Sequence, residues 1–559
     1  MHSLLELPDY ITLITYFLLV FLVAFASVFR SKERLTNTPG GYFLGGRNIG
    51  WFVIGASLFA SNIGSEHLVG LAGAGARGDF VSGQFEVLAS LILLVLAWIF
   101  VPFYLRSGVF TMPEFLEKRY SRSARSYLSA ISILSYVLTK ISVTIFAGAL
   151  VFELLLGIDF WTGAVIVVLA TGLYTVLGGL RAVVYTDLLQ MFVLIAGSIA
   201  VTYYGLQALG GVSGMQEVLA TRLSDSSRFF NLWRPVSDPD FPWTGIVFGA
   251  PILGIWYWCT DQFIVQRVLS ARDLANAQRG AIFAGYLKLL PLFLFVVPGI
   301  IAYAIHLKGA GILEVNGMME YDRALPALIL YTLPVGVKGL VVAGLLAALM
   351  SSLSSVFNSC STLFTLDFYK KWKPQSSDRE LVFVGQFSTA ALVVIALLWI
   401  PMMRILMEGG GIYQYLQNVQ AYISPPISAV FLFGLFFRRL HARAAMAALW
   451  TGFILGIGRL LLEVLAGKGI WSLPESSLLS SIVEMNFLHY ALFIFIICTI
   501  VLFTVGYRSP SGKAVDESLI FKKSNIALWS EQKVNFILSI SLIVLLIFIW
   551  LTFSKWGVA

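Results

Sequence analysis

The segment "ASNIGSEHLVG", residues 60–70, places amide, hydroxyl, carboxyl and imidazole groups in an otherwise apolar stretch. In a continuous helix, Asn62, Glu66 and His67 would lie on one face together with Ile63. A further carboxyl group, Glu86, falls in the next apolar segment. A charge at the centre of a bilayer costs at least ~2.5–3.5 kcal/mol, so such groups indicate a functional cavity. The alternative is a set of interhelical hydrogen bonds worth ~1 kcal/mol each.

A second group combines aromatic and polar side chains in "WYWCTDQFIVQR", which directly follows the Gly- and Pro-containing "GAPILG". Aromatic faces with a few polar groups are typical of small-molecule pockets. Trp and Tyr also form belts at membrane interfaces, but a belt does not explain the glycines and proline upstream. We therefore predict that Tyr257 lines a pocket or gate. Asp261 and Gln262 approach the cytoplasmic end, and a purely structural role remains open for them.

Lys288 in "GYLKLLP" lies too deep in an apolar span for its ammonium group to reach the interface easily. It requires an acceptor, either a substrate hydroxyl or a buried carboxylate such as Glu86. Another segment, "QYLQNVQ", carries four amides that we do not expect to face lipid: Gln414, Gln417, Asn418 and Gln420.

Hydroxyl groups are concentrated in "AALMSSLSSVFNSCST", where the hydroxyl-bearing residues are Ser351, Ser352, Ser354, Ser355, Ser359, Ser361 and Thr362. Sodium prefers oxygen ligands, and carbonyls freed by a broken helix can supply the remainder. Close packing of small residues is the alternative, and it explains only some of these serines. We predict sodium coordination. Asp187, in "GGLRAVVYTDLLQ", is either part of such a site or an interfacial ion-pair partner of Arg181.

The elements that must position these groups are membrane-spanning helices. The chain has 559 residues, of which 58% are hydrophobic and 12% charged, against roughly 25% charged in soluble domains. Apolar segments of the ~20 residues needed to cross a bilayer recur from Ile11 to Phe553. We predict an all-α polytopic membrane protein with about 14 transmembrane helices.

The net charge of +8 is explained by basic loops on one side of the membrane. Placing both termini outside puts most Lys and Arg in the cytoplasm, as the positive-inside rule requires, and no nucleic-acid partner is expected. The first span lacks a basic n-region and is predicted to be retained. The absence of any Asn-x-Ser/Thr sequon favours a bacterial inner (plasma) membrane. The three cysteines are predicted to be packing residues.

The second and seventh spans are both interrupted, by "SNIGSEH" and by "GAPILG" around Gly249 to Gly254. Transporters built from inverted repeats carry such interruptions in matching positions, around a central cavity. The predicted organisation is: residues 1–50, first helix and linker; 51–209, first five-helix repeat; 210–243, extracellular loop; 244–437, second five-helix repeat; 438–559, three C-terminal helices and a linker.

With these motifs in order, the chain resembles the sodium/solute symporter family, and within it the sodium/glucose and sodium/galactose cotransporters. The resemblance runs from about residue 45 to 439 and is strongest in "FASNIGSEHLVGLAGAG", "WYWCTDQFIVQR", "GYLKLLP" and "MSSLSSVFNSCSTLFTLD". It implies a LeuT-like five-plus-five inverted-repeat core and sodium-coupled symport of a neutral sugar, such as glucose or galactose, by alternating access.

The resemblance also implies site residues. The main sodium site would use the carbonyls of Ala60, Ile63 and Ala348 with the hydroxyls of Ser351 and Ser352. A second sodium site, present in some relatives, would use Asp187, Ser354 and Ser355. In the sugar site, Asn62, His67, Glu86, Lys288 and Gln417 would bind hydroxyls, and Tyr257 and Trp258 would shape the pocket or gate.

Two departures leave the solute open. Gly254 stands where close sugar-transporting relatives carry a polar side chain, and Phe85 lacks a hydroxyl found in some. Inositol or another polyol therefore remains an alternative, as does an organic anion such as a sialate or carboxylate facing Lys288. A membrane sensor is disfavoured because no soluble signalling domain is attached. An enzyme is disfavoured because no cluster of nucleophile, base and orienting group is evident.

Overall fold

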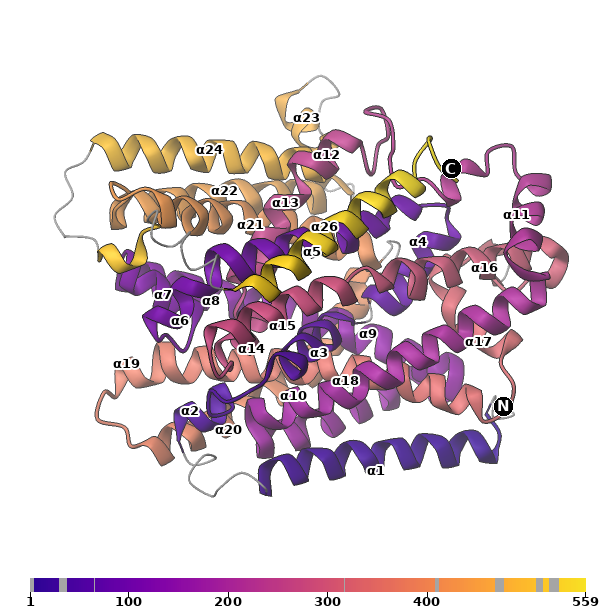
Figure 1. The fold of residues 1–559 in the computed structure, drawn as a ribbon, viewed down its shortest axis with the longest axis horizontal. Helices are drawn as coiled ribbons and strands as arrows, with labels where there is room; N and C mark the ends of the chain where they lie inside the picture. The colour runs from indigo at the N-terminus through magenta and orange to yellow at the C-terminus, as the bar shows by residue number, and fades with distance from the viewer. Residues whose placement is uncertain are drawn as a thin grey trace.

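The computed structural model describes residues 5–29, 38–64, 66–315, 317–407, 412–467, 477–508, 516–521 and 532–558. Most helices run along one common direction and form a bundle (Figure 1). Within the described residues, eleven helices are long and apolar enough to cross a membrane. The other three predicted crossings are the two interrupted spans and the first half of α10. This confirms the all-helical polytopic architecture, to which the structure adds one small hairpin, β1 (Glu314–Val315) with β2 (Met318–Met319).

The second span is broken, as predicted. Helix α3 (Trp51–Asn62) ends where Ile63 becomes extended, with φ −74° and ψ 96°. The chain resumes as η1 (Glu66–Leu71), which continues into α4 (Ala72–Ala76). The expectation that Asn62 and His67 share one helical face is therefore wrong, because they belong to separate half-helices. The side chain of Glu66 lies outside the described part of the structure.

From Phe80 to Leu209 the chain forms η2 (Phe80–Gly83), α5 (Gln84–Val95), η3 (Leu96–Phe100), α6 (Val101–Ser107), α7 (Met112–Arg119), α8 (Arg122–Tyr136), η4 (Val137–Ile141), α9 (Ser142–Val151), η5 (Phe152–Leu156) and α10 (Phe160–Leu209).

A straight helix with the 50 residues of α10 would be ~75 Å long, more than twice the hydrocarbon thickness. Gly179 breaks it, with φ 55° and ψ −160°. Only glycine fits there, because a Cβ would lie 2.6 Å from the carbonyl oxygen of Tyr42. The two halves correspond to the two predicted spans.

The seventh span consists of α12 (Trp243–Phe248), α13 (Ala250–Gly254), η7 (Ile255–Thr260) and α14 (Gln262–Leu269). The interruption predicted at Gly249 to Gly254 is wrong in position. Gly249 and Gly254 keep helical backbone angles, and Pro251 occupies the first turn of α13, where its missing N–H is not needed. The break lies at Asp261, which has φ −75° and ψ 127° and whose carboxylate caps α14 by accepting the Phe263 N–H at 3.1 Å.

After α14 the chain continues with α15 (Leu274–Leu287), η8 (Leu292–Val296), α16 (Val297–Ile305), η9 (His306–Ala310), η10 (Tyr321–Arg323), α17 (Ala324–Thr332), α18 (Val337–Leu363), η11 (Phe364–Tyr369), α19 (Lys370–Trp372), α20 (Asp378–Met407) and α21 (Ile412–Phe436). The hairpin and α17 are additions that the sequence did not predict. Helix α18 is buried along nearly its whole length and packs along α10, so its serines face protein rather than lipid.

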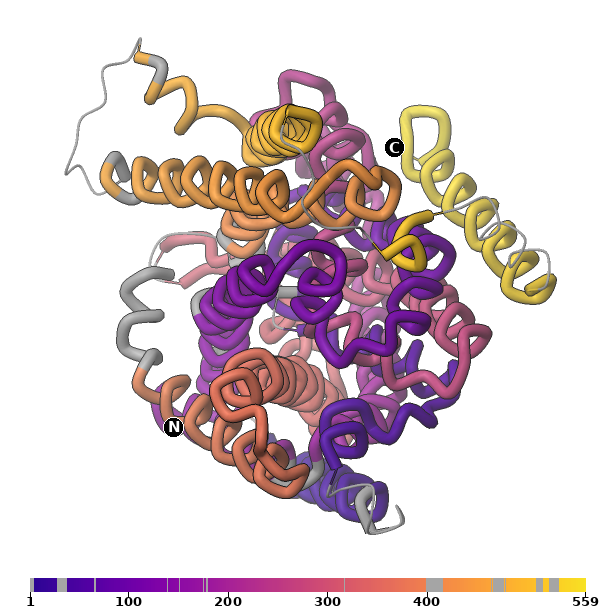
Figure 2. The backbone as a smooth tube through the Cα atoms, turned by 90° about the vertical axis from the view of Figure 1, so that its left-hand side faces the viewer, coloured from indigo at the N-terminus to yellow at the C-terminus, as the bar shows by residue number. Residues whose placement is uncertain are grey.

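The remaining elements are α1 (Leu7–Phe29), α2 (Pro39–Leu44), α11 (Gly211–Arg222), η6 (Ser227–Phe229), α22 (Ala442–Gly467), α23 (Leu478–Glu484), α24 (Phe487–Arg508), η12 (Glu517–Leu519) and α26 (Lys533–Thr552). Helices α1 and α26 lie at the edge of the bundle (Figure 2). Most of their exposed side chains are apolar, as expected for surfaces that face lipid.

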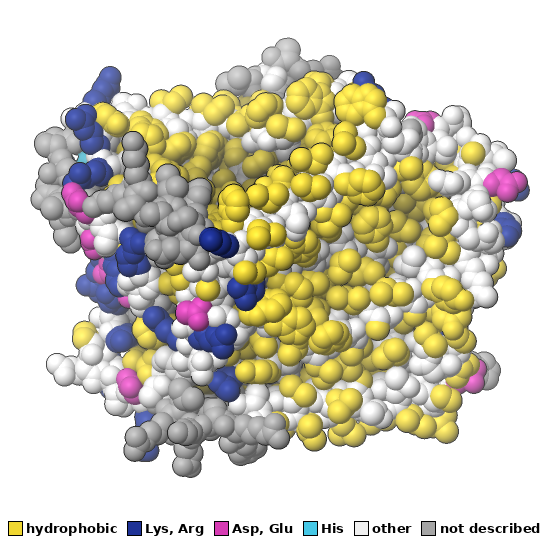
Figure 3. Space-filling view, in the orientation of Figure 1, with side chains coloured by type: hydrophobic (Ala, Val, Ile, Leu, Met, Phe, Trp, Pro, Cys, Tyr) yellow, Lys and Arg dark blue, Asp and Glu magenta, His cyan; other side chains and the backbone are white. Residues whose placement is uncertain are grey.

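The two chain ends lie at the same end of the molecule (Figure 1), which agrees with an even number of crossings. On the face shown in Figure 3, Lys and Arg gather at the opposite end, and an apolar band separates the two ends. The three cysteines, Cys259, Cys360 and Cys498, are free and buried, as predicted.

Candidate functional site

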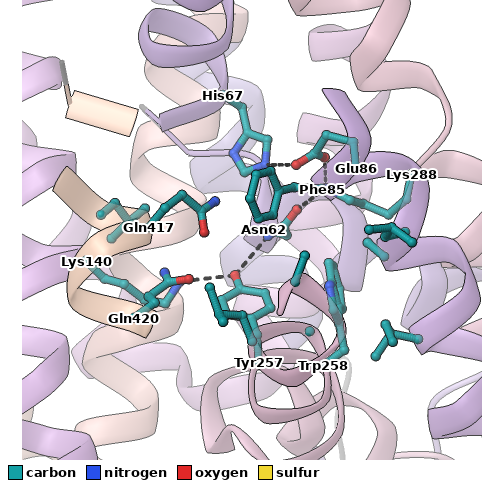
Figure 4. A pocket seen from close by; sticks show the side chains of 17 residues that line it. Asn62, His67, Phe85, Glu86, Lys140, Tyr257, Trp258, Lys288, Gln417 and Gln420 are labelled. Atoms are coloured by element: carbon teal, nitrogen blue, oxygen red, sulfur yellow. Dashed lines mark hydrogen bonds and ion pairs between the residues drawn. The ribbon is translucent and has the colours of Figure 1, made fainter. Parts of the chain in front are cut away.

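A cavity of about 70 Å³ lies where the break after α3 meets α5, η7 and α21 (Figure 4). All seven side chains predicted to bind solute line it: Asn62, His67, Glu86, Tyr257, Trp258, Lys288 and Gln417. They come from segments more than 350 positions apart in sequence. The structure thus brings the predicted set together, while the binding role of each residue stays a prediction.

The most strongly charged part of the cavity wall is the ion pair of Lys288 with Glu86. Lys288 also donates to Asn62 Oδ1 at 2.5 Å, and its side chain is only 1% exposed. His67 Nε2 lies 3.1 Å from Glu86 Oε1, and the Gly64 N–H points to His67 Nδ1 at 3.4 Å, which places the ring proton on Nε2. Of the two acceptors predicted for Lys288, the buried carboxylate is the one observed.

Tyr257 links two walls of the cavity. Its hydroxyl oxygen accepts from Asn62 Nδ2 at 2.9 Å and from Lys140 Nζ at 3.0 Å. The Lys140 ammonium also lies 4.3 Å from the centre of the Tyr257 ring, a cation–π distance. The sequence analysis did not assign Lys140 to the site. The position of Lys140 inside an apolar span could have identified it, because a buried ionisable group in a membrane is a functional candidate by default.

Apart from Gln420, the remaining lining residues are apolar or glycine: Phe85, Leu88, Ala89, Ile92, Ala250, Leu253, Gly254 and Leu416. A Cβ added to Gly254 would lie 2.9 Å from Ile92 Cγ1, so a larger side chain there would displace Ile92 or fill the cavity. A lining that mixes polar and apolar side chains suits a solute that carries hydroxyls beside C–H surface.

Of the five residues predicted for the main sodium site, Ile63 and Ser352 meet beside this cavity, whereas the Ser351 hydroxyl donates to Asp187. Ser352 Oγ, on α18, donates to the carbonyl oxygens of Ser61 at 3.1 Å and Ile63 at 3.3 Å. The end of α3 leaves these carbonyls without their intrahelical partners. Ala60 and Ala348 are buried in the same two helices. A hydroxyl and freed carbonyls therefore converge as a sodium ligand set requires, although coordination by these five residues stays a prediction.

Asp187, from the second half of α10, is completely buried. Its carboxylate accepts from Ser57 at 2.5 Å, from Ser61 at 2.9 Å and from Ser351. The alternative of an interfacial pair with Arg181 is wrong, because the Arg181 Nε donates instead to the Ser27 carbonyl at 3.1 Å.

The other members predicted for the second sodium site behave differently from each other. Ser355 donates to Ser61 Oγ at 3.2 Å and so belongs to the cluster around Asp187. Ser354 donates to the Ser351 carbonyl at 2.9 Å, within its own helix. Ser57 and Ser61 were not assigned by the sequence analysis, because contacts between α3 and α10 cannot be read from spacing along one helix.

Arg267 is a further residue that the sequence did not assign to a site. The sequence placed it among the basic residues of a cytoplasmic loop, but its side chain is 1% exposed and reaches the Asp187 cluster. By contrast, Gln262 has the structural role left open for it, since its Oε1 accepts the Met112 N–H at 2.8 Å.

Residues 42–452 match the profile of the sodium:solute symporter family. The chain belongs to this family. It is 38% identical over 523 residues to the rabbit (Oryctolagus cuniculus) sodium/glucose cotransporter 1, covering 89% of this chain and 78% of that protein. It is 39% identical over 491 residues to the mouse (Mus musculus) sodium/myo-inositol cotransporter, covering 83% and 68%. The protein is therefore a sodium-coupled solute symporter and not an enzyme.

Solved structures show the same fold. A sodium-coupled sialic acid symporter in a substrate-bound, outward-open state matches with a TM-score of 0.76 at 22% identity, covering 91% of this chain and 99% of that one. A nucleobase-cation-symport-1 family transporter in a closed conformation matches with a TM-score of 0.50 at 16% identity, covering 88% and 98%. These matches confirm the LeuT-like fold that the sequence resemblance implied.

Proposed function

We propose that this symporter carries a neutral sugar of the hexose class together with sodium. The observation that supports this most directly is the pairing of charges in the cavity. Glu86 is bound by Lys288 and His67, so the positive charge of Lys288 is already matched within the protein. A neutral, polyhydroxylated solute can exchange hydrogen bonds with these groups without adding an unpaired charge at membrane depth.

The identity of relatives supports the same class of solute. Sodium/glucose cotransporters and a sodium/myo-inositol cotransporter are similarly close to this chain, at 38% and 39% identity. Both solutes are neutral rings bearing several hydroxyls, so myo-inositol is the second candidate. At Lys288 an organic anion is disfavoured, because it would have to displace Glu86 from the ion pair. The Lys140 ammonium, bound to the Tyr257 hydroxyl, is the other cationic group in the cavity wall, so the test includes a sialate.

Sodium is proposed to bind between the end of α3 and α18. There the carbonyls of Ala60, Ile63 and Ala348 and the hydroxyls of Ser351 and Ser352 would replace its hydration shell. Asn62, next to Ile63, faces the solute cavity. Sodium that fixes this turn would favour the conformation in which the solute site is complete. Sodium would then bind one conformation more tightly than the other, as coupling by alternating access requires.

We propose further that both termini face the outside. The Lys and Arg side chains gathered at the other end of the molecule (Figure 3) would then lie in the cytoplasm, where basic residues are enriched.

The test is uptake into proteoliposomes with an inward sodium gradient, compared with the same gradient of potassium. The labelled solutes are glucose, galactose, myo-inositol and a sialate. We expect sodium-dependent accumulation of one or more of the neutral rings. Accumulation of the sialate alone, or uptake that is equal in sodium and potassium, would overturn the proposal.

A further inference from the structure

A second group of buried polar side chains lies between α3, α10, α14 and α18. Its members are Ser57, Ser61, Asp187, Arg267, Ser351 and Ser355, none of them more than 1% exposed. The group contains one carboxylate and one guanidinium, and its other members are hydroxyls. At membrane depth such a set is retained only where its charges are compensated.

The hydroxyls of two serines connect the two charges. Ser57 and Ser61 each donate a hydrogen to Asp187 Oδ2, at 2.5 and 2.9 Å. The same two oxygens accept from Arg267 Nε, at 3.0 and 2.8 Å. The guanidinium itself stands 3.9 Å from the carboxylate oxygen. Arg267 thus neutralises Asp187 through a layer of hydroxyls.

Arg267 also occupies an oxygen that a second sodium ion would need. Its Nη2 donates to Ser355 Oγ, one of the hydroxyls predicted for the second sodium site beside Asp187. A sodium ion bound to Ser355 Oγ would share this oxygen with the guanidinium. It would also place a second positive charge within a few ångströms of the first, in a site closed to water, where like charges repel strongly.

We propose that Arg267 is a tethered cation that competes with sodium for the site formed by Asp187 and Ser355. When sodium is absent from this site, the guanidinium is the counter-ion of Asp187. When sodium binds, the guanidinium gives up Ser355 and sodium takes over the neutralisation of the carboxylate. Arg267 therefore sets the sodium concentration at which this second site fills. The inference rests on the proposed sodium-coupled function and deepens it.

The experiment replaces the guanidinium with a neutral amide, Arg267→Gln, and measures binding rather than transport. The thermal stability of the purified, detergent-solubilised full chain is followed while sodium replaces potassium at constant ionic strength, because a ligand that binds the folded state stabilises it. The matched control is Arg272→Gln, since Arg272 is an exposed arginine in the next loop that pairs with Asp273.

In the wild type, sodium bound at the main site stabilises the protein first, and the further stabilisation from the second site should appear only at concentrations high enough to displace Arg267. In Arg267→Gln, Asp187 lacks its counter-ion, so the sodium concentration giving half of this further stabilisation should fall by about tenfold or more. The variant should also be markedly less stable than the wild type in potassium, and sodium should restore most of the loss. Arg272→Gln should behave as the wild type.

A second variant covers the case in which Arg267→Gln folds poorly. The double variant Asp187→Asn with Arg267→Gln removes both charges, and it should fold in potassium without the additional response to sodium. An Arg267→Gln protein that is equally unstable in sodium and potassium, or one whose half-maximal sodium concentration is unchanged or higher, would overturn the inference. Sodium-dependent uptake by the wild type, measured on the same preparation, tests the proposed function separately.

Discussion

The ion pair between Glu86 and Lys288 allows the sharpest quantitative test of the solute cavity. Their side chains are 6% and 1% exposed. Removing one member of such a pair costs about 3–5 kcal/mol, because the other charge is left buried without compensation. This corresponds to roughly two to four powers of ten in the folding equilibrium. We expect Lys288→Met and Glu86→Gln each to cause a loss of this order.

The double variant should recover most of the stability, because no unpaired charge remains. The assay is the free energy of unfolding of the wild type, both single variants and the double variant in mixed detergent micelles, analysed as a double-mutant cycle. The matched control uses the same residue types at the surface. Lys373 and Glu380 lie 2.6 Å apart, with side chains 58% and 27% exposed, and Lys373→Met with Glu380→Gln should show no measurable coupling.

The reasoning would be refuted if the losses for Lys288→Met and Glu86→Gln added to within about 0.5 kcal/mol, since residues that do not interact behave in this way. A second readout separates stability from function. The double variant should fold and still fail to bind solute, because the groups that exchange hydrogen bonds with solute hydroxyls have been removed.

Two further predictions concern the sodium site and helix packing. Ser352→Ala removes the hydroxyl next to the Ser61 and Ile63 carbonyls and should raise the sodium concentration for half-maximal uptake by about tenfold or more, the expected cost of losing one charge-assisted contact. The control is Ser361→Ala, which removes a hydroxyl that donates to the Gly385 carbonyl and should leave this sodium concentration unchanged. Equal shifts in the two variants would count against a sodium site at Ser352. Gly299→Ala would put a Cβ 1.9 Å from the Ala72 carbonyl oxygen and should lower the free energy of unfolding by about 1–3 kcal/mol. The control is Gly458→Ala, whose new Cβ has no atom within 4 Å and should not lower the free energy of unfolding. If Gly299→Ala lost no more stability than Gly458→Ala, α4 and α16 would not be in close contact.

The number of spans and the first interruption were predictable from the sequence because each depends on a local property. Span length follows from the hydrocarbon thickness, and the break after Asn62 follows from polar residues and a glycine within one apolar run. The break in the seventh span was placed too early because Gly and Pro were read as the interruption. In the structure these residues fit a helix start, and the capping carboxylate of Asp261 creates the break.

Contacts between distant helices were predictable only where the chemistry left few partners. Lys288 needed an acceptor, and Glu86 was a carboxylate buried in another span. The partners of Asp187 could not be found in this way, because Arg267 sits among basic residues that read as a cytoplasmic loop. Its burial depends on how α14 packs against α3 and α18, which no pattern within α14 encodes.

The turn that ends α3 offers a way in which the proposed solute and sodium sites could influence each other. Ser61 contacts Asp187 and Arg267, Asn62 contacts Lys288 and Tyr257, and the Ile63 carbonyl accepts from Ser352. Ser61 and Asn62 are the last residues of α3 and Ile63 is its C-cap, so the helix holds them on one side only and these side-chain contacts fix the other. A ligand that changes one contact must shift the backbone that presents the other two. Coupling between the sites then follows from a single turn with three sets of partners, and it does not require a longer chain of contacts through the protein.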